Sequence, residues 1–385
     1  MRSLLRILGI VLVVLAILAV VAFAFRGPLL RRFGIALPQG DPGLAEVQLP
    51  SGFIMTAFAS GLNGPRFMAI GPGGVLFVAE RGANRVVALP DRDGDGRADE
   101  TLVVADDLQA PSSLAFDGNT LYIGETTRVT RLRLGPDLRP LQRDVIIADL
   151  PSGPGHSTRT ILLGRDGRLY VASGSSCNVC NERDPHRAAV WVYNADGSGG
   201  RLFARGLRNA VGLALNPWTG EIWATNNGRD LLGDDSPPET VYVVQDGRDY
   251  GWPRCHAGTL VDPQFGGPGA CDGIERPILE MQAHMAPLGL TFYAAEQFPP
   301  QYRGLFIALH GSWNRSVPVG YKVMRVPLVD GHVAGPAEDF ATGWLKPDGS
   351  SWGRPVGVTV AADGSLLVSD DKGGFVYRIS SSQRR

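Results

Sequence analysis

His156 is the residue of this sequence best placed to accept a proton. It follows a Gly-Pro-Gly turn and opens the segment His156-Ser157-Thr158-Arg159, which leads into a predicted strand. An imidazole has an ordinary pKa of about 6.5 and can therefore act as a general base near neutral pH. A lone histidine is more often structural, but the place that the fold gives to this one favours the catalytic interpretation.

Basic residues recur in comparable segments along the chain. They are Arg66, Arg81, Arg159, Arg208, Arg229, Arg315, Arg354 and Lys372. In a protein of formal net charge -1, a cluster of these side chains is repulsive unless an anionic ligand or interspersed carboxylates offset it. Two interpretations stay open: a small anionic partner bound by the cluster, or pairing of each arginine with an acid such as Glu80, Glu125 or Asp371.

A short acidic segment has the spacing of a calcium-binding loop. Its sequence, DRDGDGRAD, places carboxylates at Asp91, Asp93, Asp95 and Asp99 and a glycine at the sharp turn. The twelfth position, where a bidentate Glu is expected, is Leu102. The segment predicts a structural calcium ion, and a solvated acidic turn is the alternative.

The elements that position these residues form a repeat. An apolar strand, a glycine turn and a second strand recur at 67–80, 113–125, 161–174, 211–226, 288–310 and 356–370, and further strands follow each copy. Four strands per unit are typical of a propeller blade. The sixth copy lacks its fourth strand, which is found ahead of the first copy at 53–62. We therefore predict an all-β fold, a six-bladed β-propeller of four-stranded blades closed by an N-terminal strand.

This fold brings the candidate residues to one end of the central channel. The innermost strand of each blade starts at one face, and the loop between the second and third strands returns to that face. Both classes of loop therefore surround one mouth. His156, Arg208, Asn209 and Arg354 lead into innermost strands, and Arg315 follows a second strand. We expect the functional site at this mouth.

Five motifs carry a resemblance to a known family. They are GPGHSTR around His156, GLRNAVGLALNP around Arg208, ETVYVVQDGRDYGWP ending at Pro253, HGSWNR at Arg315 and GRPVGV at Arg354. Together they resemble the sorbosone dehydrogenase family, which is related to the soluble quinoprotein glucose dehydrogenases. Those proteins are six-bladed propellers that use pyrroloquinoline quinone (PQQ). The resemblance spans roughly 52–379.

The resemblance implies roles for individual residues. It makes His156 the general base that removes a hydroxyl proton while hydride passes to the quinone, with Arg159 as an aid. It implies cofactor or substrate contacts by Arg208 and Asn209 and a cofactor carboxylate bound by Arg354.

Two positions depart from the family pattern. The family's calcium ion takes main-chain oxygens from a Gly-Pro step, for which Gly228 and Arg229 stand here. The family's cofactor-binding lysine is matched only by Asn314 or Arg315, and Lys372 joins them as a further cofactor-binding candidate. The implied cofactors are thus PQQ and Ca2+.

The N-terminal segment predicts export. Residues 7–25 form an uncharged apolar stretch long enough to cross a membrane as a helix, and a cleaved signal peptide is the alternative. Four cysteines in two close pairs predict two disulfides, which fit an oxidising compartment. We therefore expect a membrane anchor or signal segment at 1–33 and a catalytic propeller at 34–385. The expected location is the periplasmic face of the inner membrane, or periplasmic or secreted after cleavage.

The leading functional hypothesis is a PQQ-dependent dehydrogenase that oxidises a sugar or a sugar-derived aldehyde or alcohol. Its expected partners are the sugar, the membrane and a respiratory electron acceptor, and the near-neutral charge excludes nucleic acid. A calcium-dependent lactonase or esterase and a non-catalytic carbohydrate-binding propeller are the alternatives. Tyr250 and Trp252 are interpreted as packing residues rather than as sugar platforms.

Overall fold

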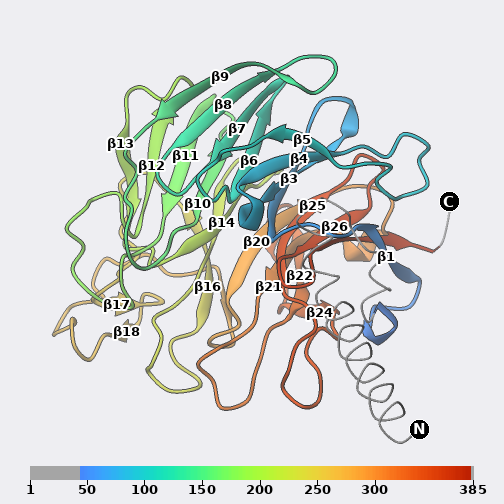
Figure 1. The fold of residues 1–385 in the computed structure, drawn as a ribbon. Helices are drawn as coiled ribbons and strands as arrows, with labels where there is room; N and C mark the ends of the chain where they lie inside the picture. The colour runs from blue at the N-terminus through green and yellow to red at the C-terminus, as the bar shows by residue number, and fades with distance from the viewer. Residues whose placement is uncertain (1–43, 383–385) are drawn as a thin grey trace, which may run out of the picture. The chain divides into compact units, whose positions relative to one another are not determined.

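The computed structural model describes residues 44–382, which form a six-bladed β-propeller (Figure 1). Consecutive innermost strands contact one another all the way round, from β2 (Pro65–Ile70) through β6 (Ser113–Asp117) and onward to β25 (Pro355–Val360), which contacts β2 again. The ring is therefore closed, and the predicted fold class is confirmed.

The strands of each blade run antiparallel from the channel outward. Blade 1 is β2, β3 (Leu76–Glu80), β4 (Arg85–Leu89) and β5 (Leu102–Ala105); blade 2 is β6, β7 (Thr120–Gly124), β8 (Val129–Leu134) and β9 (Pro140–Ile147); blade 3 is β10 (Arg159–Leu163), β11 (Arg168–Ser173), β12 (Ala189–Asn194) and β13 (Arg201–Arg205). Blade 4 is β14 (Ala210–Leu215), β15 (Ile222–Asn226), β16 (Glu239–Val244) and β19 (Leu279–Met281). Blade 5 is β20 (Pro287–Tyr293), β21 (Gly304–Leu309), β22 (Lys322–Val329) and β24 (Glu338–Ala341), and β23 (His332–Val333) pairs with the end of β22. Blade 6 is β25, β26 (Leu366–Asp370), β27 (Phe375–Ser381) and β1 (Phe53–Ala59).

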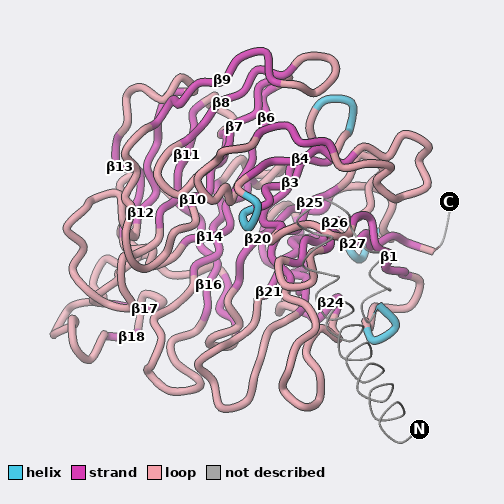
Figure 2. The backbone as a smooth tube through the Cα atoms, viewed as in Figure 1, coloured by secondary structure: helices cyan, strands magenta, loops and turns pink. Residues whose placement is uncertain are grey.

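Short elements complete the fold. A two-stranded hairpin, β17 (Cys255–His256) and β18 (Leu260–Val261), lies in the long insertion of blade 4 (Figure 2). Among the described residues, 3-10 turns are found at η1 (Leu44–Glu46), η2 (Pro72–Gly74), η3 (Arg81–Ala83) and η4 (Pro300–Tyr302). Both predicted disulfides are confirmed, Cys177 with Cys180 and Cys255 with Cys271.

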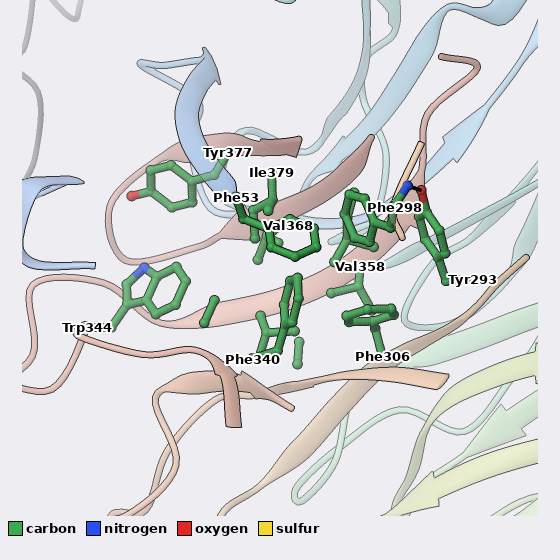
Figure 3. Packing of buried hydrophobic residues seen from close by; sticks show 14 of the residues in the cluster. Phe53, Tyr293, Phe298, Phe306, Phe340, Trp344, Val358, Val368, Tyr377 and Ile379 are labelled. Atoms are coloured by element: carbon green, nitrogen blue, oxygen red, sulfur yellow. Dashed lines mark hydrogen bonds between the residues drawn. The ribbon is translucent and has the colours of Figure 1, made fainter. Parts of the chain in front are cut away.

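The N-terminal strand closes the ring as predicted, because β1 pairs antiparallel with β27 in blade 6. Its first residue, Phe53, is 9% exposed and packs edge-on against Phe298 and Phe340, with ring centroids 4.7 and 5.2 Å away (Figure 3). Buried aromatic pairs of this geometry stabilise a core beyond the area that they bury. The displaced strand is thus held by a side chain that fills the gap between blades 5 and 6.

Each gap between neighbouring blades holds its own hydrophobic cluster. In blade 1, Leu76 and Val78 face blade 6, whereas Phe77 and Ala79 face blade 2. This follows from the period of two in a strand, which sends alternate side chains to opposite faces of the sheet. Strands buried on both faces read as continuous apolar runs, and that is why the repeat is visible in the sequence.

Glycines at matching positions of the inner strands let neighbouring blades approach. A Cβ atom on Gly212 would lie 2.2 Å from the carbonyl oxygen of Leu288, and one on Gly289 would lie 2.8 Å from that of Val356. Hydroxyl groups bridge the same junctions, as where Thr225 Oγ1 donates to Leu288 at 2.6 Å. The VGL and LGL motifs therefore serve blade packing at the channel wall.

The predicted membrane anchor at 7–25 and the division after residue 33 lie outside the described residues. Within 44–382 no helix has the length and apolar character to span a membrane.

Candidate functional site

Contacts between blades confirm that the two classes of loop meet at one mouth. Arg66, the second residue of β2, binds Asp371, which follows β26, and Arg354, ahead of β25, donates to the carbonyl oxygen of His310, which follows β21. The guanidinium of Arg81 reaches across blade 2 to Ser157 beside His156, at 2.9 Å. The loops of distant blades thus form one continuous polar surface.

His156 is held in one tautomer. Its Nδ1 lies 3.0 Å from the carbonyl oxygen and 3.1 Å from the hydroxyl oxygen of Ser175. The carbonyl can only accept, and the Ser175 hydroxyl hydrogen is already donated to Cys177 O at 2.6 Å. Nδ1 therefore carries the proton, and Nε2 keeps its lone pair. The ring is partly exposed and can act as a base at Nε2.

The surroundings keep this imidazole neutral. Burial lowers the pKa of His156 to about 3, and the positive charges of Arg208, Arg187 and Arg159 act in the same direction. The hydrogen bond to Ser175 opposes them only in part. The base is consequently unprotonated throughout the neutral range.

Two buried arginines support the loop that carries His156. Arg159 is 0% exposed and donates to the carbonyl oxygens of Pro151, His156 and Thr158. Arg187 is 5% exposed and donates to His156 O at 2.7 Å and to Ser152 O at 2.7 Å. In this arrangement both act on His156 by positioning and charge rather than through a substrate. The sequence pointed to Arg159, but nothing in it singles out Arg187, whose partners are all main-chain oxygens.

Arg208 is saturated by protein acceptors. Arg208 as a whole residue is 4% exposed. Its guanidinium donates to the main-chain oxygens of Asn178 and Gly228, at 2.9 and 2.5 Å, and to the carboxylate of Asp230 at 2.7 Å. Asn178 lies inside the Cys177–Cys180 ring and also receives Nη2 of Arg208 on its side-chain oxygen at 3.0 Å. The disulfide thus fixes the turn against which Arg208 is placed.

Asn209 links this arginine to the histidine. Its side chain donates to Asn227 at 3.3 Å. A Cβ atom built on Gly174 would lie 2.3 Å from Asn209 Oδ1 and 2.6 Å from His156 Cβ. The glycine at the end of β11 therefore lets His156 and Asn209 approach each other, which supports their assignment to one site.

The predicted calcium position at Gly228 and Arg229 is occupied by other contacts. Gly228 O accepts a hydrogen bond from Arg208, so a cation there would face a guanidinium. The side chain of Arg229 turns into the blade 4 insertion, where it pairs with buried Asp262, which also binds His256 at 2.8 Å. The residues as arranged do not fit a calcium ion at this step, and we assign no reaction step to one there.

A buried carboxylate organises the same loop. Glu239 accepts hydrogen bonds from the backbone N–H groups of Gly228 at 2.8 Å and Ala286 at 3.3 Å. Burial raises its pKa to about 7, although both hydrogen bonds and the charge of Arg208 oppose the shift. Glu239 therefore ties the loop after β15 to the start of β20, and its negative charge is only partly present at neutral pH.

The opposite side of the mouth holds a histidine–aspartate pair. His310 Nε2 lies 2.9 Å from Asp371, whose other oxygen accepts from Arg66 at 2.7 Å. Burial alone would raise the pKa of Asp371, but the bonds to His310 and Arg66 outweigh burial and lower it to about 2. Arg354 donates to main-chain oxygens beside this pair and lies over the ring of Tyr321.

The remaining cofactor-binding candidates contact other residues of the loops at the rim of the mouth. Asn314 donates to Asp230 at 2.9 Å, and Arg315 binds the backbone of Asp234 and the carboxylate of Asp235. Lys372 donates to Ser351. None of these contacts tests a role in binding a cofactor, and that role stays a prediction.

The predicted arginine cluster divides into two groups. Arg66, Arg208, Arg229 and Arg315 each have a carboxylate partner, as the second interpretation proposed. Arg81, Arg159, Arg354 and Lys372 have none among the described residues, nor does Arg187, which was not predicted; their side chains donate only to neutral oxygens. Three of these side chains, those of Arg81, Arg159 and Arg187, contact the segment that carries His156.

The acidic segment of blade 1 has the geometry of a cation site. One carboxylate oxygen from each of Asp91, Asp93 and Asp95 lies within 4.8 Å of the others. Asp91 Oδ1 is buried and has no hydrogen-bond partner among the described residues, while Asp99 accepts the N–H of Arg92 at 2.7 Å. Calcium at this loop remains a prediction.

We expect calcium to stabilise the protein through this loop. At a hundredfold excess over its Kd, a ligand that binds only the folded state adds about 3 kcal/mol to the free energy of unfolding. Calorimetry should show a calcium-dependent rise in Tm that is absent in the Asp93→Asn/Asp95→Asn variant. The matched control is Asp106→Asn/Asp107→Asn, another exposed acidic pair. A calcium response that survives in the first variant would contradict the prediction.

A cavity of about 350 Å3 lies inside the channel. It is lined by inner-strand residues without ionisable side chains, such as Phe67, Gly212 and Val358. The hydroxyls of Ser113 and Thr160 on its wall donate to carbonyl oxygens of neighbouring strands. The cavity offers no acid, base or cation, so the chemistry is placed at the mouth.

Comparisons with known proteins agree with the fold. The chain is 30% identical to an uncharacterized protein of Borreliella burgdorferi, over 87% of this chain and 91% of that one. It is 26% identical to a pyrroloquinoline quinone-dependent sugar dehydrogenase of Hypocrea jecorina, over 84% and 87%. Among solved structures, the Trichoderma reesei Carbohydrate-Active Enzymes Family AA12 protein in its calcium structure matches with a TM-score of 0.77, 22% identity and coverage of 90% and 99%.

The holo PQQ domain of the Coprinopsis cinerea pyranose dehydrogenase matches with a TM-score of 0.75, 24% identity and coverage of 87% and 97%. The resemblance to quinoprotein propellers that the motifs indicated is thus confirmed, while sorbosone as a substrate stays a prediction. The TrAA12-like family matches residues 47–263 and 269–382. The chain belongs to the TrAA12-like family.

Proposed function

We propose that the protein is a PQQ-dependent dehydrogenase that oxidises a sugar or a sugar-derived alcohol or aldehyde at the mouth of the propeller. The observation that carries the proposal is the state of His156, which is neutral, held at Nδ1 and without a hydrogen bond at Nε2 from the described residues, with the guanidinium groups of Arg159 and Arg187 bound to its backbone. A base of this kind beside an anion-binding surface suits the removal of a hydroxyl proton next to a polycarboxylate cofactor.

The donors of the mouth fit such a cofactor. Arg81, Arg159 and Arg187 supply positive charge without a direct carboxylate partner among the described residues, and their side chains donate to neutral oxygens. The buried Nε atoms of Arg66 and Arg159 have no hydrogen-bond partner among the described residues. Arg81 and Arg354, which are partly exposed whereas Arg159 is buried, would hold the cofactor carboxylates. The names of the relatives support the same cofactor.

The chain's own residues account for the proton. When bound, the quinone would accept the hydride from the substrate carbon. His156 Nε2 takes the hydroxyl proton, so a neutral carbonyl product forms and one proton resides on the ring. Ser175 keeps the ring oriented through Nδ1, and Arg159 and Arg187 keep its loop in place. The surrounding charges then favour the release of that proton, because they lower the pKa of the imidazole.

The two disulfides support an oxidising compartment. With the apolar segment 7–25, they support a place on the periplasmic face of the inner membrane, or release after cleavage. Electrons would leave toward a respiratory acceptor.

Reconstitution tests the proposal. We would add PQQ to the purified full-length protein, with and without calcium, and record absorbance spectra before and after adding aldoses. The proposal expects saturable quinone binding and sugar-dependent reduction of the bound quinone. Saturable binding without reduction by any aldose, polyol or sugar aldehyde would contradict the dehydrogenase assignment, and no binding at micromolar quinone would contradict the cofactor.

A further inference from the structure

Two loops of the mouth expose large apolar side chains beside the site. Trp313 is 72% exposed in the loop between β21 and β22, and Leu231 is 72% exposed in the loop between β15 and β16. Leu231 also has a positive φ of 68°, a conformation that costs energy for a residue with a side chain. Both side chains are thus held in solvent beside the mouth.

The backbone on both sides of Trp313 is fixed. Ser312 exchanges hydrogen bonds with Val319 and accepts one from the hydroxyl of Tyr321 at 2.6 Å. Asn314, on the other side, donates to Asp230 at 2.9 Å. The indole is therefore presented to solvent from a rigid support rather than from a mobile loop tip, which is how preorganised binding residues are held.

The same contacts connect Trp313 to the catalytic residues. Asp230, the partner of Asn314, also binds Arg208 at 2.7 Å, and the charge of Arg208 acts directly on His156. Arg315 and Ser316 bind Asp234, so the two rim loops are joined by further contacts beyond the indole. Trp313 thus belongs to a rim loop in which its neighbour Asn314 shares Asp230 with Arg208.

We propose that Trp313 is the platform on which the pyranose ring of the substrate stacks before oxidation. The proposal rests on the proposed function and names the form of the sugar that the site takes. The C–H groups on one face of a pyranose pack against an indole, while its hydroxyls need acceptors and donors around the ring. The polar groups next to Trp313 meet that need, since Asp235 is exposed and Ser316 is exposed as well.

A protein partner fits the same surface less well. The core of a protein interface is depleted in charged residues, whereas here the exposed polar residues Asp235 and Ser316 belong to the same two loops as the exposed side chains of Leu231, Trp313 and Val317. One isolated aromatic among carboxylates and amides is the composition of a sugar subsite.

Kinetics and direct binding test the proposal with matched variants. Trp313→Ala should raise KM for glucose and cellobiose about tenfold with kcat within about twofold, because stacking contributes on the order of 1 kcal/mol. Trp313→Phe should recover most of the loss. Trp218→Ala is the control, since Trp218 is 43% exposed and lies in the turn between β14 and β15, away from the mouth. The open-chain polyol sorbitol should be affected much less than either pyranose.

Fluorescence titration separates this proposal from the proposed function. Glucose or cellobiose should quench the emission of the quinone-free protein, and the saturable part should vanish in Trp313→Ala but not in Trp218→Ala. Quenching without any oxidation would support the platform and count against the dehydrogenase. Unchanged KM and unchanged quenching in Trp313→Ala would overturn the platform, as would a variant whose only defect is slower electron transfer to a protein acceptor.

Discussion

His156→Asn is expected to lower kcat for sugar oxidation by about a hundredfold to ten-thousandfold, the contribution of a positioned general base. Asparagine places an amide N–H close to where Nδ1 lies, so the bond to Ser175 can persist while the base at Nε2 is removed. Rate measurements at saturating sugar, with quinone binding followed by absorbance, would separate the loss of the base from loss of the cofactor.

The pH profile provides the sharper test. Because the pKa of His156 is lowered to about 3, the ring stays neutral as the pH falls from 8 to 5. We expect kcat/KM to show no acidic decline from this group within that range. An unperturbed histidine would lose half of the active form near pH 6.5. A decline centred there that disappears in the asparagine variant would contradict the electrostatic account of the site.

The same shift predicts how stability depends on pH. The unfolded state binds a proton at His156 below about pH 6.5, whereas the folded state does so only near pH 3. Between these values the unfolded state binds more protons, so acid destabilises the wild type through this residue. His156→Asn should therefore lose less stability than wild type between pH 7.5 and 4.5 in urea titrations. His332→Asn, at an exposed histidine, serves as the control.

The propeller could be predicted because each blade repeats the same local chemistry. Both faces of strands such as β3 and β26 are buried, so their apolar runs stand out, and the glycines at 212, 289 and 357 recur where inner strands meet. The fourth strand of blade 4 was harder to place. It pairs over only three residues, Leu279–Met281, and a long insertion precedes it in the chain.

The site could be predicted in position but not in pairing. Arg66 and Asp371 are 305 residues apart in the chain, and no local pattern reports that they meet. Likewise Arg229 finds Asp262 in an insertion held by a disulfide. Arg187 carries one of the positive charges that have no ion-pair partner among the described residues, and no sequence motif identified it. Hydrogen bonds from a side chain to main-chain oxygens cannot be predicted from sequence motifs, because every residue has a carbonyl oxygen.

Arg208 offers the second large effect, because it connects the disulfide turn, the loop after β15 and the rim. Arg208→Met would remove the cationic partner of Asp230, which keeps its hydrogen bond from Asn314 and is 21% exposed, so the change is expected to cost about 3 kcal/mol of unfolding free energy, the low end for breaking a buried pair. Arg208→Lys keeps the charge but cannot reach the same five acceptor contacts, so it should recover only part of that energy. Urea denaturation measures both.

The double variant Arg208→Met/Asp230→Asn decides between a structural and a functional arginine. Removing both charges should restore a large part of the stability, since neither is then left unpaired. If Arg208 also contacts the cofactor or substrate, as the family resemblance implies, sugar oxidation should stay low in this restabilised protein. The pKa of His156 should rise as well, because the charge of Arg208 is the strongest electrostatic contribution that lowers it. A double variant that regained stability, activity and the wild-type pH profile together would show that the arginine only holds the loops.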